Sequence, residues 1–265
     1  MTNGSAPATV SHSRLADYAR CGEAYRLKRV VQVPQRPSVA QIAGKAWHQW
    51  AQDHEYGPLF GTWADYLESA VADAVAESGY TRAGFKVTGR KTKARPDGET
   101  LDVWRDELGP ELCRLYEGAD WGEFDEIATA LPNDSKGNPN GLEYHLELGA
   151  PYHWQGYVDQ IRVDRHGNLM VVDLKTWSRK RITTQLEEYC AAGQILGLPT
   201  VYACYYTARK GIVESKHIGK WSKDTLMQYI NAGRTGINAG YFPPSVGDHC
   251  SWCDVAEHCM FRPYV

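Results

Sequence analysis

The chain has 265 residues, of which 43% are hydrophobic and 23% charged, as expected for a globular protein with a sizeable core. Its formal net charge of −3 does not by itself indicate a nucleic-acid partner, but it does not exclude one, because acidic metal ligands can offset a basic groove. No apolar run has the length of a membrane span and residues 1–10 lack the hydrophobic core of a signal peptide, so we expect a cytoplasmic protein without a membrane partner.

The expected organisation is a disordered head over residues 1–10, followed by one domain over residues 11–265. The first part of this domain, residues 11–140, is expected to be mainly helical. Apolar residues at helical spacing predict helices over residues 11–31, 40–55, 63–78 and 102–117. The strongly basic stretch over residues 86–97 is either a solvated loop or a flap that contacts phosphates. A loop rich in proline, asparagine and glycine comes next, over residues 131–140.

Residues 141–220 are expected to form the core of the domain, and residues 221–265 a last helix and a cysteine-rich tail. Apolar or alternating segments predict strands over residues 142–148, 154–163, 169–172, 200–207 and 211–218. Turn residues join the second and third of these strands in a hairpin. Helical spacing predicts helices over residues 183–196 and 221–238. The fold class is therefore α/β, a mixed sheet flanked by helices.

The predicted hairpin carries two carboxylates and one ammonium. Asp173 and Lys175 occupy alternate positions after an apolar run and so share one face of the strand, while Leu174 points the other way. If the strands pair around the turn, Asp159 lies near Asp173 at the open end of the hairpin. This position needs an explanation, because the strand before it is apolar enough to belong to a core.

Two explanations fit these three residues. An exposed ion pair on an edge hairpin is common and contributes little energy. The alternative is a site for Mg²⁺ or Mn²⁺, in which the carboxylates bind the cation and the lysine positions or deprotonates a water. Val171 and Val172, which directly precede Asp173, favour the metal, because a carboxylate near a core is costly to bury without a cation.

A second group of metal-binding residues lies at the end of the chain. Cys250, Cys253 and Cys259 have the spacing Cys-x2-Cys-x5-Cys, which brings three thiolates to one centre and leaves a fourth position open. Cys21 is the natural candidate for the fourth ligand. The alternatives are that His249 or His258 completes a zinc site, or that these are buried structural cysteines. In a cytoplasmic protein such a group indicates a metal rather than disulfides. The remaining three cysteines, in apolar contexts, are expected to be core residues: Cys113, Cys190 and Cys204.

These residues resemble the motifs of the PD-(D/E)XK nuclease superfamily, and most closely those of its RecB-like branch. The motifs are Gly-x-x-Asp ending at Asp159, Asp-x-Lys-Thr from Asp173, and Gln185-x-x-x-Tyr189, after a helical histidine that His48 matches. One cysteine near the N-terminus and three near the C-terminus are similar to those that hold a 4Fe–4S cluster in CRISPR-associated and repair iron–sulfur exonucleases. The resemblance runs from about residue 11 to residue 259.

The resemblance implies a role for each matching residue. His48, Asp159, Asp173 and the backbone carbonyl of Leu174 would bind the cation, and Lys175 would orient the attacking water. Gln185 and Tyr189, on one face of a helix, would position the substrate or the lysine. The four ligands of the 4Fe–4S cluster, with zinc as the alternative metal, would be Cys21, Cys250, Cys253 and Cys259. Glu143 or Glu147 could add a carboxylate, but we assign neither to the site.

The function implied is a metal-dependent DNA exonuclease acting on single-stranded DNA or duplex ends. Its partners would include DNA and other repair, recombination or CRISPR-adaptation proteins, in a bacterial or phage-infected cell. The alternatives are a non-catalytic nucleic-acid-binding protein with the same fold, a zinc-stabilised nuclease, and an electron-transfer protein. The aromatic and basic residues shortly after Lys175 are candidates for gripping a DNA strand: Trp177, Arg179, Lys180 and Arg181.

Overall fold

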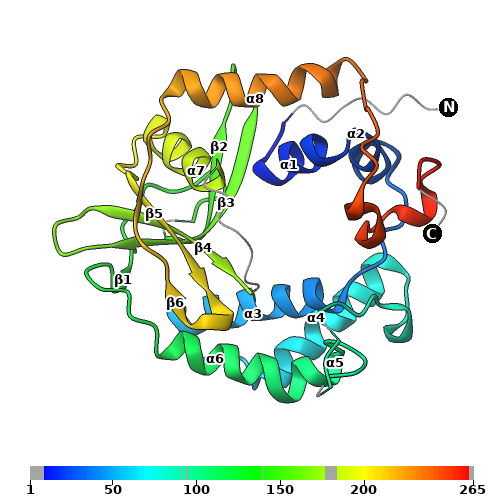
Figure 1. The fold of residues 1–265 in the computed structure, drawn as a ribbon. Helices are drawn as coiled ribbons and strands as arrows, with labels where there is room; N and C mark the ends of the chain where they lie inside the picture. The colour runs from blue at the N-terminus through cyan, green and yellow to red at the C-terminus, as the bar shows by residue number, and fades with distance from the viewer. Residues whose placement is uncertain (1–8, 90, 94, 139, 177–183, 263–265) are drawn as a thin grey trace.

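The computed structural model describes residues 9–262 except residues 90, 94, 139 and 177–183. Helices cover both faces of a β-sheet, as Figure 1 shows. The α-helices are α1 (His12–Arg20), α2 (Gly22–Tyr25), α3 (Val39–Tyr56), α4 (Trp63–Ser78), α5 (Leu101–Val103), α6 (Gly109–Glu117), α7 (Thr184–Ile195) and α8 (Lys223–Asn238). Shorter helical turns are η1 (Arg26–Val31), η2 (Arg82–Gly84), η3 (Trp104–Leu108), η4 (Ala208–Lys210), η5 (Asp248–Trp252) and η6 (Ala256–His258).

The described residues form one seven-stranded mixed sheet in the order β1-β3-β4-β5-β6, with β2 paired to β3 and β7 paired to β5. The strands are β1 (Glu126–Ile127), β2 (Leu142–Leu148), β3 (Trp154–Val163), β4 (Leu169–Lys175), β5 (Tyr202–Thr207), β6 (Ile212–Val213) and β7 (His217–Ile218). β3 and β4 form the predicted hairpin, whereas β4 and β5 are parallel. A parallel pair needs a crossover connection, and α7 is the helix of that connection. The expected mixed sheet flanked by helices is confirmed.

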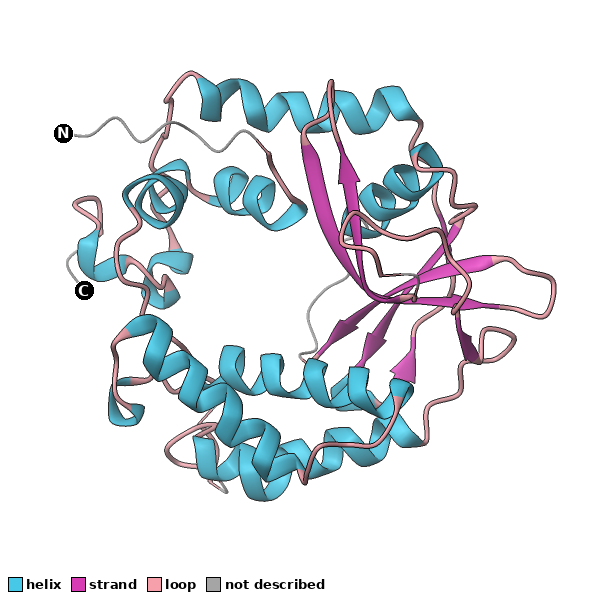
Figure 2. Ribbon diagram, turned by 180° about the vertical axis from the view of Figure 1, so that it is seen from behind, coloured by secondary structure: helices cyan, strands magenta, loops and turns pink. Residues whose placement is uncertain are grey.

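Strand β4 is buried on both faces, and it ends at the candidate site. Val172 and Leu174 pack with the residues of α3, α4 and α6. Val171 packs instead with residues of α7 and α8, on the opposite face. Figure 2 shows these two groups of helices on either side of the sheet. An apolar run without alternation is typical of a strand covered on both faces, and this explains the sequence of β4.

The expected single helix over residues 11–31 is wrong, because the chain breaks at Cys21. Cys21 has extended backbone angles, ends α1, and its thiol accepts the N–H of Ala24 at the start of α2. Gly22 packs against Phe242 and Pro243 so closely that a Cβ would come within 2.7 Å of both. The third segment, η1, is a π-helical turn. Packing against the C-terminal segment therefore overrides the continuous helical pattern.

The N-terminal and C-terminal segments lie side by side, in both Figure 1 and Figure 2. The N–H of Ser245 donates to the sulfur of Cys21, and Val255 packs in the same small cluster as Cys21. Of the expected disordered head, residues 1–8 lie outside the described residues. Val10, which we placed in that head, is fully buried and pairs with Trp154 at the start of β3.

The other predicted elements agree with the structure to within a few residues. The helix expected over 102–117 consists of three consecutive helical segments, and the strand expected over 211–218 is divided into β6 and β7. Parts of the basic stretch 86–97 and the cluster at residues 177–181 lie outside the described residues. Among the described helices, none combines the length and apolar character that a membrane span requires.

A buried polar network fixes α3 against the sheet. Arg162, on β3, is only 1% exposed, and its guanidinium lies 3.6 Å from the ring centroid of Trp121. The same guanidinium contacts the carboxylate of Glu55 near the end of α3 and donates to Gln160 at 3.0 Å. Tyr116 of α6 donates to Glu55 at 2.6 Å. The network ties α3, α6 and β3 together, and α3 and β3 are the elements that carry His48 and Asp159.

We expect Arg162→Ala to lower the free energy of unfolding by about 3 kcal/mol, because it leaves the partly buried carboxylate of Glu55 without its cation. Chemical denaturation measures this change. The matched control is Arg114→Ala, which removes an exposed ion pair with Glu111 and should leave the midpoint unchanged. Equal effects of the two substitutions would contradict the structural role of the network.

Candidate active site

A cleft of about 600 Å³ lies between α3, the middle of β3 and the end of β4. Helix α3 lines one side of the cleft, through residues between Ala40 and Gln52. All the residues that we predicted for catalysis or cation binding line this one cleft: His48, Asp159, Asp173, Leu174, Lys175, Gln185 and Tyr189. The structure therefore brings together residues from four elements that are far apart in the sequence.

The hairpin holds its two aspartates at the predicted end. Gln160 pairs with Val172, which places Asp159 beside Asp173 on the neighbouring strand. The backbone N–H of Leu174 donates to Oδ2 of Asp159 at 2.7 Å, while the leucine side chain packs in the core. Lys175 forms an ion pair with Oδ2 of Asp173. The predicted geometry of the hairpin, with the leucine side chain turned away from the site, is confirmed.

Gln185 connects the residues of the hairpin to α7. Its Nε2 donates to Oδ1 of Asp173 at 2.6 Å and to the hydroxyl of Tyr189 at 3.1 Å. Its Oε1 accepts from the ammonium of Lys175 at 3.4 Å. One amide thus holds both the aspartate and the lysine in place. Tyr189 in turn packs edge-on against Trp154, at the start of β3.

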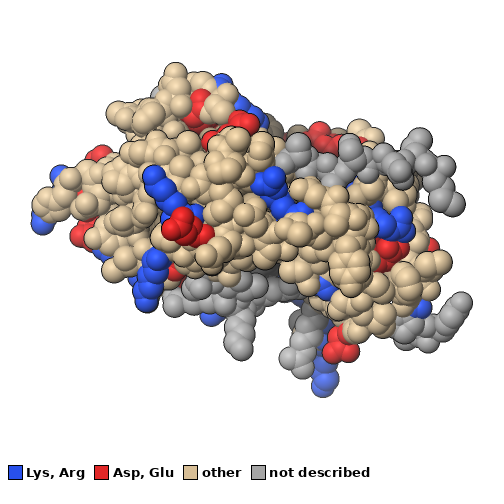
Figure 3. All heavy atoms as spheres, turned by 90° about the horizontal axis from the view of Figure 1, so that it is seen from above, with Lys and Arg blue, Asp and Glu red and all other residues tan. Residues whose placement is uncertain are grey.

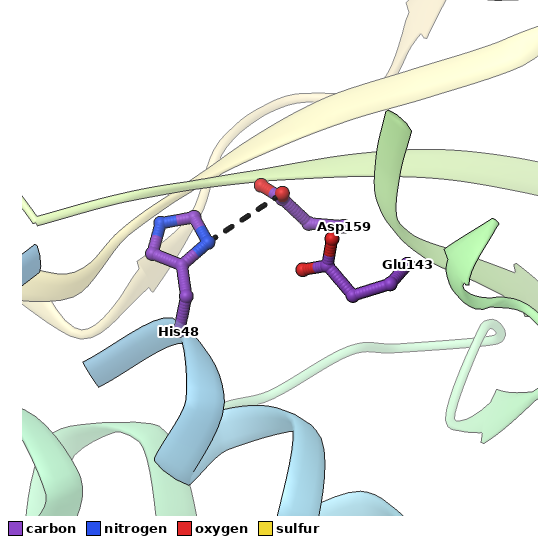
Figure 4. A group of neighbouring side chains, drawn as sticks. All are labelled: His48, Glu143 and Asp159. Atoms are coloured by element: carbon purple, nitrogen blue, oxygen red, sulfur yellow. Dashed lines mark ion pairs between the residues drawn. The ribbon is translucent and has the colours of Figure 1, made fainter. Parts of the chain in front are cut away.

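Three side chains form a candidate cation site, shown in Figure 4. Ligand atoms of His48, Glu143 and Asp159 all lie within 4.8 Å of one another. Nδ1 of His48 is 3.5 Å from Oδ1 of Asp159. His48 projects from α3 and the two acids from β2 and β3, so the group closes only when the helix packs on the sheet.

Glu143 is the residue that the sequence did not single out. It lies on β2 between the pairs Leu142–Gln160 and Tyr144–Val158, and therefore opposite Asp159. Its φ is 48°, in the left-handed region that residues other than glycine rarely adopt. From the alternating pattern of β2, Glu143 and Glu147 are equally good candidates for a metal ligand. Only the pairing of β2 with β3 places Glu143 at the cation site, and this pairing cannot be predicted from the sequence of β2.

Burial and charge shift the pKa values of the acids in opposite directions. Burial, with the charge of Asp159, raises the pKa of Glu143 to about 7. Burial also raises the pKa of Asp173, although Lys175 opposes the shift. The net shift of Asp159 is downward. Burial raises its pKa, but the neighbouring His48 and Lys175 lower it by more. The cleft therefore stabilises one carboxylate as an anion and resists ionisation of the two others.

The two basic side chains both have raised pKa values. Burial lowers the pKa of His48, but the charges of Asp159 and Asp173 outweigh it, and the net shift is upward. The same balance raises the pKa of Lys175. A lysine with a raised pKa is a proton donor that holds water or phosphate by its charge, and it is poorly suited to act as a general base at neutral pH.

The residues of the cleft fit a hard divalent cation. Oδ2 of Asp173 is buried and has no hydrogen bond of good geometry within the described part of the chain, apart from its ion pair with Lys175. Carboxylate oxygens are the preferred ligands of Mg²⁺ and Mn²⁺, and imidazole is accepted by the transition metals. A cation here would offset the burial and the charge repulsion that together raise the pKa of Glu143 and Asp173.

The four predicted cluster ligands line one cavity, where the N-terminal and C-terminal segments lie side by side. Cys21, Cys250, Cys253 and Cys259 line it together with apolar residues such as Val255. No three of these four described sulfurs lie within 4.8 Å of one another. The remaining three cysteines are buried in the core as predicted, and burial raises the pKa of each to about 12: Cys113, Cys190 and Cys204.

Comparison with known proteins shows which family the chain belongs to. The Gene 69 protein of Mycobacterium phage D29 is 23% identical in an alignment 276 positions long, which covers 94% of this chain and 95% of the phage protein. The sequence profile of the PD-(D/E)XK nuclease superfamily matches residues 9–260, which include both the cleft and the cysteine cavity. The chain therefore belongs to the PD-(D/E)XK nuclease superfamily.

Proposed function

We propose that this protein is a divalent-metal-dependent DNA exonuclease of the RecB-like, iron–sulfur type. The observation that carries the proposal is the group of His48, Glu143 and Asp159, which share a candidate cation site beside the Asp173–Lys175 pair. Superfamily membership supports metal-dependent nuclease chemistry. The exonuclease and iron–sulfur assignments rest on the motif order and the cysteine positions.

Each residue of the cleft would have a distinct task. His48, Glu143 and Asp159 would hold the cation, with Asp173 and the carbonyl of Leu174 as further ligands. The bound cation would lower the pKa of a water ligand and offset the charge of the phosphate. Lys175 would hold the attacking water by a hydrogen bond. The side-chain amide of Gln185 contacts both the ammonium of Lys175 and the carboxylate of Asp173, and so keeps the two together.

DNA is the proposed substrate, and its contacts are expected at the cleft. On the face that carries α8, basic and acidic side chains are interspersed among uncharged residues (Figure 3). Phosphate contacts dominate nonspecific DNA affinity, so such a face is poorly suited to bind a strand. Full-length similarity to a mycobacteriophage protein supports phage DNA metabolism as the setting, ahead of host repair or CRISPR adaptation.

A 4Fe–4S cluster is the proposed occupant of the cysteine cavity. A tetrahedral zinc site has Zn–S bonds of about 2.3 Å, which place its sulfurs about 3.8 Å apart. The four cysteine sulfurs, all in the described part of the chain, are spread more widely than that. The sulfurs are therefore not arranged as a preformed tetrahedral zinc site. The proposed cluster would join α1 and α2 to the C-terminal tail, which are distant in sequence, and so restrict the unfolded chain.

The first test is cleavage of labelled DNA with Mn²⁺. Asp173→Ala and Lys175→Ala should each reduce the rate about 100-fold or more, because they remove a metal ligand and the group that orients the water. Asp224→Ala and Lys216→Ala are matched controls on the surface outside the cleft and should cleave like the wild type. End-labelled and circular substrates distinguish exonuclease from endonuclease products. Cleavage by Asp173→Ala at the wild-type rate would refute the site.

The second test is the pH dependence of cation binding. Protons compete with Mn²⁺ for Glu143 and His48 below their raised pKa values, so binding should strengthen as the pH rises through about 7. The increase in melting temperature with Mn²⁺ should be larger at about pH 8 than at about pH 6. Without Mn²⁺, the raised pKa of Glu143 has the opposite effect: it lowers stability progressively from about pH 4.5 to about pH 7, because the unfolded chain loses its proton first.

Glu143→Gln should weaken Mn²⁺ binding at every pH and reduce its pH dependence. The matched control is Glu147→Gln on the same strand, whose side chain is 51% exposed. It should respond to Mn²⁺ as the wild type does. A response of the wild type that is independent of pH would argue against Glu143 as a ligand, and so would identical behaviour of the two variants.

The third test is the metal content of the purified protein. Cys250→Ala should lose the visible absorbance and the iron of the cluster and melt at a lower temperature. Cys113→Ala, which changes a buried core cysteine, should lose stability but keep its iron. A colourless wild-type protein with stoichiometric zinc and no iron would rule out the cluster.

A further inference from the structure

Two exposed tyrosines lie next to the candidate active site and have no role in it. Tyr56 ends α3 and is 60% exposed, and Tyr157 of β3 is 40% exposed. Large aromatic side chains usually bury most of their surface, so an exposed pair beside a cleft calls for an explanation. We call Tyr56, Tyr157 and the neighbouring Lys136 the tyrosine rim.

Tyr56 continues the face of α3 that lines the cleft. Gln49 and Gln52 line the cleft, and Tyr56 comes seven and four residues after them, which places it on the same face of the helix. From His48 to Tyr56 the helix rises about 12 Å. A DNA strand that runs from the cation site along α3 would therefore place one of its next few nucleotides beside Tyr56.

Tyr157 continues the β2–β3 strand pair beyond the cation site. It precedes Asp159 by two residues, about 7 Å along the strand. Tyr157 pairs with His145 on β2, in the same way that Asp159 lies opposite Glu143. The imidazole of His145 stacks on the tyrosine ring at 4.5 Å. His145 is buried, and its backbone N–H donates to Asp134 at 2.9 Å. A fixed ring thus supports the exposed one.

One loop holds both tyrosines. Asn140 donates its side-chain amide to the hydroxyl of Tyr56, and Lys136 contacts the hydroxyl of Tyr157. The ammonium of Lys136 lies 4.6 Å from the centre of the Tyr157 ring. Asp134 organises the loop by accepting the backbone N–H groups of Lys136 and Asn138, both at 2.8 Å. The two rings are therefore held by a structured loop rather than placed on mobile side chains.

We propose that the tyrosine rim is a base-stacking subsite for single-stranded DNA at the end of the cleft near Glu143. This proposal rests on the nuclease function and extends it to a substrate class. Unpaired bases expose their ring faces and stack on aromatic side chains with little sequence preference, whereas the bases of a duplex are already stacked. Lys136 would contact the phosphate of a stacked nucleotide.

The test is the binding of a labelled single-stranded oligodeoxynucleotide, measured by fluorescence anisotropy with Ca²⁺ in place of Mn²⁺. Tyr56→Ala and Tyr157→Ala should each weaken binding about 5- to 100-fold, the loss expected for one stacked base. Tyr56→Phe and Tyr157→Phe should bind much more tightly than the alanine variants, because they lose the hydroxyl contacts to the loop but keep the ring on which a base stacks. Lys136→Ala should reduce the slope of log affinity against log salt by about 1. The matched control is Tyr241→Ala, because Tyr241 is 64% exposed and does not line the cleft.

Oligonucleotides with one abasic position identify the stacked base. An abasic nucleotide at that position should weaken binding by the wild type but have no effect on the corresponding alanine variant. Wild-type affinity of both alanine variants, or equal losses for single-stranded and duplex DNA without an abasic effect, would overturn the stacking subsite and leave the nuclease function intact. A wild-type protein that neither binds nor cleaves DNA would overturn both proposals.

Discussion

The structure depends on the meeting of three acids, the buried Asp173 and the half-buried Asp159 and Glu143, at one end of the β3–β4 hairpin. Asp159, Asp173 and Glu143 lie within one cleft, and the cations that face them are His48 and Lys175. Without a further cation, charge repulsion and burial keep two of the acids from ionising readily. The site is thus arranged for a ligand of positive charge, and packing of α3 on the sheet brings that arrangement together.

The remainder of the fold serves to hold these elements in register. The buried Arg162–Glu55 network attaches the end of α3 to β3, and Gln185 attaches α7 to the hairpin. Val10 extends the sheet beside Trp154, which packs against Tyr189 of α7. The cysteine cavity then joins the two ends of the described chain. Apart from the contacts at the cysteine cavity, each connection restrains an element that carries a residue of the cleft.

Local pattern and spacing were enough to predict the hairpin and its two aspartates. The apolar run of β4, the turn after β3 and the Asp-x-Lys alternation sufficed to place Asp159 beside Asp173 and to turn Leu174 into the core. The break at Cys21 could not be foreseen, because it results from packing against Phe242 and Pro243. Glu143 was not assigned for a similar reason: strand pairing and an unusual backbone angle select it, and both depend on tertiary structure.

The most direct test of the central claim is anomalous diffraction from crystals grown with Mn²⁺. We expect a single strong peak within bonding distance, about 2.2 Å, of His48, Glu143 and Asp159, because these three side chains already place ligand atoms within 4.8 Å of one another. A well-ordered cleft without an anomalous peak would contradict the account. A peak bound only by other residues would do so equally.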